Sequence, residues 1–328
     1  DKGMLVPRMT TVQRTAISTP AAGLMVYDSD TQSFWFYHNV TGWMNTLSSA
    51  TGWTTTGNVT SGTEFIGTSN DQSLVFKVNN MPAGKIEKTG QNTLLGYTSG
   101  QLISTGINNA AFGYGSLRQA TTGSGNVAFG FETLRSSTTG LRNTAIGMSS
   151  MYFNTIGEYN VGVGSFSMYK NTSGSNNVAL GDAALNQNTT GNNNIAIGQY
   201  SLYSNVANSR STAIGKGAME NADDRTSGVE TFNTAIGYEA LKGSASASAN
   251  TGRFNTAIGD KALFLISSGN ENIALGRNTL LNNSSGNRNT AIGQGALLNN
   301  IANSRSTAIG YQAMRNADIN AIGLETYN

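Results

Sequence analysis

Asn143-Thr-Ala-Ile-Gly147 is one copy of a five-residue motif that returns along most of this 328-residue chain. The usual order is Asn, a small or β-branched residue, Ala, an aliphatic residue or Phe, and Gly. Fourteen closing glycines run from Gly96 to Gly323, 17 residues apart except for two gaps of 22 and a final gap of 13. Such a period indicates one structural unit stacked on itself, so the sequence predicts a parallel β-solenoid with 17-residue coils.

The motif alternates, which predicts a short β-strand whose Asn, Ala and Gly share one face while the aliphatic residue faces the other way. A Leu or Met follows four residues after each closing glycine, as at Leu134 and Met151. We expect the aliphatic residue and the Leu or Met to stack into two apolar columns that form the core. The asparagines are expected to form amide ladders. The constant Ala indicates a close backbone approach, either inside the coil or against another subunit. We favour another subunit, because so thin a coil buries little by itself.

A second glycine keeps step with the motif, seven residues before the next closing glycine, as at Gly123 and Gly140. Asn208 and Asn303 stand at this position in two of the coils. Gly and Asn are the residues that enter the left-handed backbone region most readily. The exchange therefore predicts a corner with positive φ at this position.

The tandem Asn-Thr-Ala-Ile-Gly units resemble the YadA-like head repeats of trimeric autotransporter adhesins. They resemble still more the solenoid region of bacterial and phage tail-fibre-like proteins. The resemblance covers about 237 residues from Asn92 onward. It implies a left-handed parallel β-roll, a homotrimer, an extracellular place on a bacterial surface or a phage or phage-like tail, and a base or anchoring protein at the N-terminal end.

The N-terminal third supports the fibre interpretation. Two runs rich in aromatic and β-branched residues, Gly23–Tyr27 and Phe34–Tyr37, flank a turn-like segment and predict a β-hairpin, with Trp43 on a further strand. Together with Lys2–Met9 they resemble a module that precedes such stalks in surface and tail-fibre proteins. Residues 51–91, which include Phe65–Thr68 and Leu74–Asn80, are similar to the connector of those fibres. We therefore expect a β-rich module over 1–50, a β-rich connector over 51–91 and the solenoid over 92–328.

Composition removes several classes of function. Charged residues make up 12% of the chain and the net charge is +2, so electrostatic capture of nucleic acid or of an anionic membrane has no basis. The chain has no cysteine, which removes disulfides, thiol catalysis and thiolate metal sites. No apolar run approaches the roughly 20 residues that span a bilayer. Dinucleotide, P-loop, EF-hand and HExxH motifs are missing as well, so we expect no cofactor and no metal.

Few residues could carry catalysis. His38 is the only histidine, and we interpret it as a surface turn residue rather than as a member of a Ser-His-Asp triad. Asp223 and Asp224 could offer oxygens to a hard cation, but we interpret them as a solvated loop tip. We therefore expect no catalytic residues and no enzymatic activity.

Two surface features are candidates for receptor binding. The two 22-residue coils carry five extra residues each, within 221–231 and 243–253, and these loops should protrude side by side, although solenoid corners also simply tolerate insertions. The position after the closing glycine is aromatic on three successive coils; these rings could stack on sugars, or pack against the N-terminal module or a neighbouring subunit. The candidate receptor-binding residues are Asp223, Asp224, Arg225, Glu230, Arg253, Tyr97, Tyr114 and Phe131.

The leading hypothesis is a structural, non-enzymatic trimeric fibre that presents a surface for attachment to a host-cell or surface receptor, with a glycan as one candidate. A polysaccharide-processing tailspike is the alternative. It needs two carboxylates about 5–10 Å apart in a groove, and the neighbouring-coil pair Glu239 and Asp260 is offset by one position, toward opposite faces. An ice-binding solenoid is a third interpretation, which the variation among Thr, Val, Ile and Ala at the second motif position disfavours.

Overall fold

A computed structural model describes residues 5–46 and 66–317 of the chain. The chain divides into two compact units, Asp1–Gly67 and Thr68–Asn328. Phe65, with the N-terminal part of the predicted connector, and the motif that closes at Gly323 lie outside the described residues. The rest of the predicted connector belongs to the same unit as the solenoid.

The N-terminal unit contains a four-stranded sheet with the order β1-β2-β3-β4. Strand β2 (Met25–Asp28) pairs antiparallel with β3 (Ser33–His38), and β3 pairs antiparallel with β4 (Gly42–Asn45), so the predicted hairpin and further strand are confirmed. Strand β1 (Arg8–Met9) lies parallel to β2 and precedes the short helix α1 (Thr11–Thr15). The helix is too short for a periodic signal, and its only trace in the sequence is a capping box between Thr10 and Gln13.

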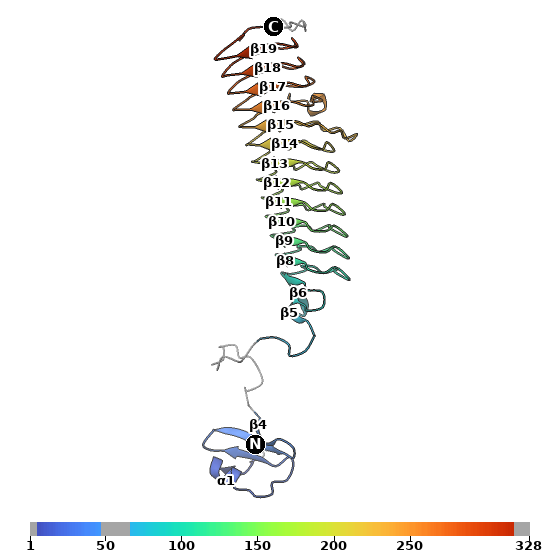
Figure 1. Cartoon of the computed structure of the whole chain (residues 1–328). Coiled ribbons are helices and arrows are strands. Elements are labelled where there is room, and N and C mark those ends of the chain that lie inside the picture. Colours follow the sequence, from blue (N-terminus) through green and yellow to red (C-terminus); the bar gives the residue numbers. More distant parts are fainter. Residues whose placement is uncertain (1–4, 47–65, 318–328) are drawn as a thin grey trace. The chain divides into compact units, whose positions relative to one another are not determined.

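The C-terminal unit is a parallel β-solenoid, as predicted (Figure 1). It begins with an antiparallel hairpin of β5 (Leu74–Val78) and β6 (Met81–Ile86), and β6 pairs antiparallel with β7 (Thr93–Leu95). From β7 onward each strand pairs in parallel with the next one along the chain. The later strands are β8 (Ala110–Phe112), β9 (Val127–Phe129), β10 (Thr144–Ile146), β11 (Val161–Val163), β12 (Val178–Leu180), β13 (Ile195–Ile197), β14 (Thr212–Ile214), β15 (Thr234–Ile236), β16 (Thr256–Ile258), β17 (Ile273–Leu275), β18 (Thr290–Ile292) and β19 (Thr307–Ile309).

The register of the sheet is constant from coil to coil. Ala128 of β9 pairs with Ala145 of β10 across a 17-residue coil. Ala213 pairs with Ala235, and Ala235 with Ala257, across the two 22-residue coils. The five extra residues of each long coil are therefore accommodated outside the sheet.

The interior of each coil holds the motif Ala, the motif Asn and the Leu or Met that follows. Asn143, Ala145 and Met151 are all fully buried, so the predicted Leu and Met column is confirmed. The motif's aliphatic residue is not in the core, contrary to the prediction. Ile146, for example, faces outward and is 41% exposed. The predicted alternation is confirmed, but the core lies on the alanine side of the strand.

The constant alanine also corrects the expectation of a contact with another subunit at that residue. Ala145, Ala213 and Ala235 are fully buried within a single chain, where they belong to the same cluster as the Leu and Met column. The close approach is therefore between two walls of one coil. The small side chain is required by the narrowness of the coil itself.

The predicted asparagine ladder is confirmed. Asn143 donates from its backbone N–H and from Nδ2 to Oδ1 of Asn126 in the preceding coil, at 2.9 and 3.2 Å. Its Nδ2 also donates to the carbonyl oxygen of Gly157 at 2.8 Å. Asn160 repeats the pattern on Asn143. Asn143 thus bonds both to the preceding coil and to the next one, which satisfies its polar atoms without water.

The second glycine of each coil is not a left-handed corner, so that prediction was wrong. Positive φ occurs at the closing glycines instead, with values of +119° at Gly147 and +128° at Gly164, whereas Gly140 lies outside this region. A Cβ added to Gly140 would lie 2.7 Å from the carbonyl oxygen of Gly157 in the next coil. Glycine is required at Gly140 because the next coil stacks too closely there for a side chain.

Asn208 can replace this glycine because the coil that follows it carries the first insertion. Its Nδ2 donates to the carbonyl oxygen of Asp223, and its Oδ1 accepts from the backbone N–H of Val229, both at 3.0 Å. The asparagine therefore fills space that the enlarged coil opens. It is not a substitute chosen for its backbone conformation.

Candidate functional site

The outer face of the solenoid sheet is an uncharged strip that runs through every coil from β7 to β19. Its side chains are the first and third residues of each three-residue strand, on either side of the buried central residue. The first position holds Thr, Val, Ile or Ala, and the third holds Ile, Leu, Val or Phe. None of these 26 positions is charged, although the chain average of 12% would place about three charged residues among them.

This outer face is long enough to matter for association. Thirteen strands at about 4.8 Å give a strip about 60 Å long, and two outward positions per strand make it about 10 Å wide. The resulting patch of about 600 Å² is at the upper limit of what monomers usually expose, and close to the roughly 800 Å² that one partner contributes to a stable interface. Its third positions remain partly exposed, as Ile146 and Ile258 show.

The predicted aromatic column lies beside this face, one residue beyond each closing glycine. Tyr97 stacks on Tyr114 with ring centroids 6.0 Å apart, and Tyr114 stacks on Phe131 at 5.3 Å. All three rings are exposed. Phe112 and Phe129, on the outer face of the neighbouring strands, stack at 4.5 Å. The column of Tyr97, Tyr114 and Phe131 therefore broadens the apolar strip at the first coils of the solenoid.

The two insertions lie side by side, as the stacking of coils predicts. Figure 1 shows both widening the same side of the solenoid between β14 and β16. Asn250 of the second insertion donates from Nδ2 to the carbonyl oxygen of Asn221 at the base of the first, at 2.5 Å. The second insertion also contains a short 3-10 helix, η2 (Ala247–Ala249). The loops are thus tied to one another.

A groove begins at these insertions and continues over the coils that follow. It has a volume of about 650 Å³. Arg225 comes from the first insertion and Arg253 from the end of the second, while Arg288 and Arg305 come from later coils. Its remaining lining residues are Thr251, Phe254, Asn270, Glu271, Asn287 and Ser304. Sequence reasoning missed this groove, although the 17-residue spacing of Phe254, Glu271, Arg288 and Arg305 already places them in one column.

The candidate receptor-binding residues of the insertions lie in different environments. Asp223 is only 4% exposed and holds Arg225 through bonds from Nε and Nη2, so it is not part of a solvated loop tip. These bonds raise the pKa of Arg225 above its usual range. Asp224 is exposed, and Glu230 forms an ion pair with Arg210 at 2.9 Å. Only Arg225 and Arg253 of the predicted set line the groove.

The two carboxylates considered for the tailspike alternative face basic side chains. Burial would raise the pKa of Glu239, but hydrogen bonds and charge from Lys242 and Lys261 outweigh it and lower that pKa. A general acid needs the opposite shift. Asp260 faces Arg277 at 4.0 Å. Within residues 5–46 and 66–317, no cluster of three or more His, Cys, Asp or Glu side chains is arranged to hold a metal ion.

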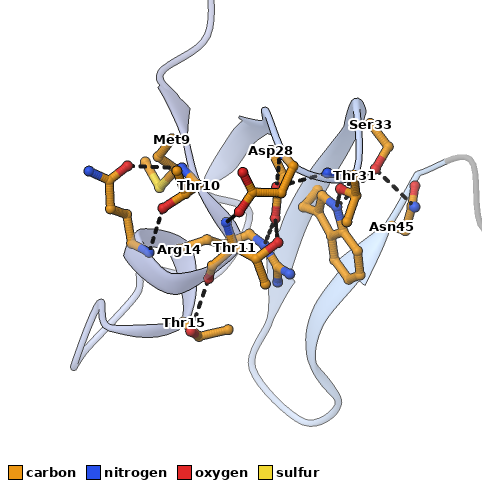
Figure 2. A network of polar contacts seen from close by, with 12 residues as sticks. Met9, Thr10, Thr11, Arg14, Thr15, Asp28, Thr31, Ser33 and Asn45 are labelled. Atoms are coloured by element: carbon orange, nitrogen blue, oxygen red, sulfur yellow. Dashed lines mark hydrogen bonds and ion pairs between the residues drawn. The ribbon is translucent and has the colours of Figure 1, made fainter.

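The N-terminal unit is organised by a buried ion pair (Figure 2). Arg14 of α1 donates from Nε to Oδ2 of Asp28 at the end of β2, at 2.9 Å, and both side chains are almost fully buried. Burial would raise the pKa of Asp28, but bonds from Arg14, from Thr11 and from two backbone N–H groups lower it to about 2. The guanidinium also lies 3.7 Å from the ring centroid of Trp35. The helix is thereby fixed to the sheet.

His38 lies outside this network. It ends β3, is exposed, and its Nδ1 bonds with Thr41 in the turn that leads to β4. The structure thus places it in a surface turn, as expected. No helix in the described part of the chain is both long and apolar enough to cross a membrane.

Comparison with known proteins adds one finding. Residues 1–63 match the family model described as a phage tail like trimerisation region. This segment contains the whole β1–β4 sheet and α1. No curated protein and no solved structure matches the chain. The match agrees with the expected tail-fibre-like character of the N-terminal module, and the likeness of the repeats to YadA-like heads stays a prediction.

Proposed function

We propose that the chain is a structural, non-enzymatic, homotrimeric fibre protein of a phage or phage-like tail. Residues 1–63 bring three chains together, and the solenoids then associate through their uncharged outer faces. The N-terminal end attaches to a base protein, and the insertions present an attachment surface to a receptor. The observation that carries the proposal is the continuous outer face of β7–β19, in a chain whose N-terminal segment matches a trimerisation region.

The energetics favour association along this face. An isoleucine that is about 40% exposed, such as Ile146, has that fraction of its burial still to gain. Full burial of such a side chain stabilises by about 1.5–3 kcal/mol, so covering each one contributes about 1 kcal/mol. Chains already joined by their N-terminal units meet at high effective concentration, which lowers the entropic cost of bringing the solenoids together. The free energies gained by covering each outward side chain then add along the strip, because the register is constant from coil to coil.

Sedimentation equilibrium of the full chain tests the proposal directly. The expected mass is three times 34.3 kDa. The double variant Ile236→Asp and Ile258→Asp places charges in the proposed interface, and it should lower the melting temperature and loosen the trimer. Ile156→Asp is the matched control, because Ile156 is 54% exposed but lies away from the sheet.

A wild-type monomer at micromolar concentration would overturn the trimer. A trimer whose melting temperature responds equally to the interface variant and to Ile156→Asp would show that the outer face is not the interface. Host attachment is tested separately, by trimming both insertions back to the 17-residue register. Undiminished attachment after trimming would leave the chain as a spacer without a receptor surface in its loops.

A further inference from the structure

We propose that the groove lined by Arg225, Arg253, Arg288 and Arg305 binds an anionic polysaccharide. This inference rests on the proposed attachment function and specifies the class of receptor. The groove joins the two features that distinguish this part of the solenoid, because both insertions supply residues to it. It then continues over the regular coils that follow, so that its walls are periodic.

Charge is the first argument for an anionic ligand. Four of the ten lining residues are arginines and one is a glutamate, which gives the groove a formal charge of +3. The whole chain carries only +2. Asp223, which pairs with Arg225 but does not line the groove, lowers the local formal charge to +2, which equals that of the whole chain on a small part of its surface. Guanidinium groups are planar and offer paired donors, which suits them to the carboxylates or sulfates of an acidic sugar.

The arginines differ in how they are held, which suggests different roles. Asp223 fixes Arg225, and Glu271 accepts from Nε of Arg288 at 3.0 Å, so both guanidinium groups are held in place beside the groove. Arg253 is exposed and forms no ion pair within the described residues. We expect Arg253 to contribute the largest share of ligand charge recognition.

The groove also offers a flat apolar surface and fixed amides. Phe254 is 53% exposed, and its ring stacks on that of Phe232 at 5.2 Å with an angle of 8° between the planes. Asn270 accepts from the backbone N–H of Arg253, and Asn287 accepts from the backbone N–H of Asn270. An exposed aromatic ring that can contact a sugar thus lies beside a row of hydrogen-bonded amides. A site that is ordered before binding loses little entropy on binding.

The repeat of the solenoid suits a polymer better than a single sugar. Phe254, Glu271, Arg288 and Arg305 occupy the same position in four successive coils. Neighbouring coils are about 4.8 Å apart, so the ligand would meet similar groups at a regular interval along the groove. A polysaccharide can contact several of these levels at once, and weak contacts at each level then combine.

Binding of polygalacturonate to the full-length trimer, followed by biolayer interferometry at low and high salt, tests this inference. We expect polygalacturonate, which carries one carboxylate per sugar, to bind at low salt and to be released as salt rises. Dextran, which is neutral, should bind at least tenfold more weakly. The double variant Arg253→Gln and Arg305→Gln should weaken polygalacturonate binding about tenfold or more, and Phe254→Ala should also weaken it.

Arg142→Gln is the matched control. Arg142 stands at the same position in its own coil as Arg288 and Arg305 do in theirs, and it contacts Tyr159 instead of the groove. It should leave polygalacturonate binding unchanged. Equal losses in the control and the groove variant would overturn the groove as the site. Equal binding of dextran and polygalacturonate would overturn the anionic class.

A groove filled by a neighbouring copy of the chain is the other occupant to consider. In that case the double variant would lower the melting temperature of the trimer without a specific effect on polygalacturonate, which would overturn the inference. Host attachment separates this inference from the proposed function. If trimming the insertions abolishes attachment while the arginine variant still attaches, the proposed function is supported and the groove is not the receptor site. If polygalacturonate binding needs the groove arginines but host attachment needs neither the arginines nor the insertions, the groove binds anionic polysaccharide and the proposed attachment role is overturned.

Discussion

Gly140→Ala is expected to weaken the stacking of two coils, even though the backbone at Gly140 is not left-handed. The added Cβ would lie 2.7 Å from the carbonyl oxygen of Gly157, 3.0 Å from Oγ of Ser137 and 3.1 Å from Nδ2 of Asn143. The serine side chain can rotate away. The carbonyl cannot, because it belongs to the backbone of the next corner and accepts a hydrogen bond from Asn143. The next coil must therefore move.

The magnitude follows from these contacts. Adding a methyl group to a close-packed site costs about 1–3 kcal/mol. Weakening the buried bond from Asn143 to Gly157 adds about 1 kcal/mol. The total of about 2–4 kcal/mol falls on one coil–coil interface, and the stability of a solenoid depends on such nearest-neighbour interfaces. Gly140→Asn and Gly140→Val should be at least as damaging, since their Cβ atoms occupy the same point.

Denaturant unfolding of the full chain, followed by far-UV circular dichroism, measures the effect. Gly295→Asn is the control, because Gly295 does have a positive φ of +68° and its Cβ would lie 3.5 Å from Cγ of Gln312. Asn278, with φ of +55°, stands at the same position in another coil. The control should therefore cost less than about 1 kcal/mol. Wild-type stability for Gly140→Ala, or a mild Gly140→Asn beside a severe Gly140→Val, would refute the close approach.

Two further predictions concern the coil interior and the N-terminal unit. Ala213→Leu should destabilise the solenoid by about 1–3 kcal/mol in thermal melts, because Ala213 is fully buried in the narrow coil, whereas Ile214→Leu on the outer face should change little. The pKa of Asp28 is lowered from 3.8 to about 2, so the stabilisation by its ionised form is complete above about pH 4 and is lost as the pH falls toward 2. Tryptophan fluorescence at a fixed urea concentration reports this loss of stability, because all three tryptophans lie within the first 53 residues. The pH dependence should be missing in Asp28→Asn. A wild-type protein whose stability does not change between pH 4 and pH 2 would contradict the reasoning.

Much of the fold follows from local and repeated features of the sequence. The 17-residue period predicts the coil, since identical segments stacked in register must adopt the same backbone. The alternation around Ala145 predicts a strand, and the column of Leu134 and Met151 predicts one wall of the core. Asn143 and its equivalents predict the ladder, because an amide repeated at one position can bond to its own copy in the next coil. These inferences need only the order of residues along the chain.

The sites were harder to predict, because they depend on distances between coils. Asp223 and Arg225 are two residues apart in a polar insertion, and nothing in that segment reveals that one is buried and the other borders a groove. The groove combines residues of two insertions with residues of three later coils, and the unequal coil lengths hide their alignment. The position shared by Arg288 and Arg305 was the signal available.

The sequence by itself determined that this protein is a β-solenoid built from one small repeated coil, because the period constrains every repeat alike. Only the tertiary structure decided which face of the strand is inside. Alternation shows that Ala145 and Ile146 point in opposite directions, and hydrophobicity alone would bury the isoleucine. Ala145 packs in one buried cluster with the Leu and Met column inside the narrow coil, so alanine fills the core and isoleucine is left on the surface. The same closeness of neighbouring backbones, rather than a left-handed φ, explains the glycine at position 140.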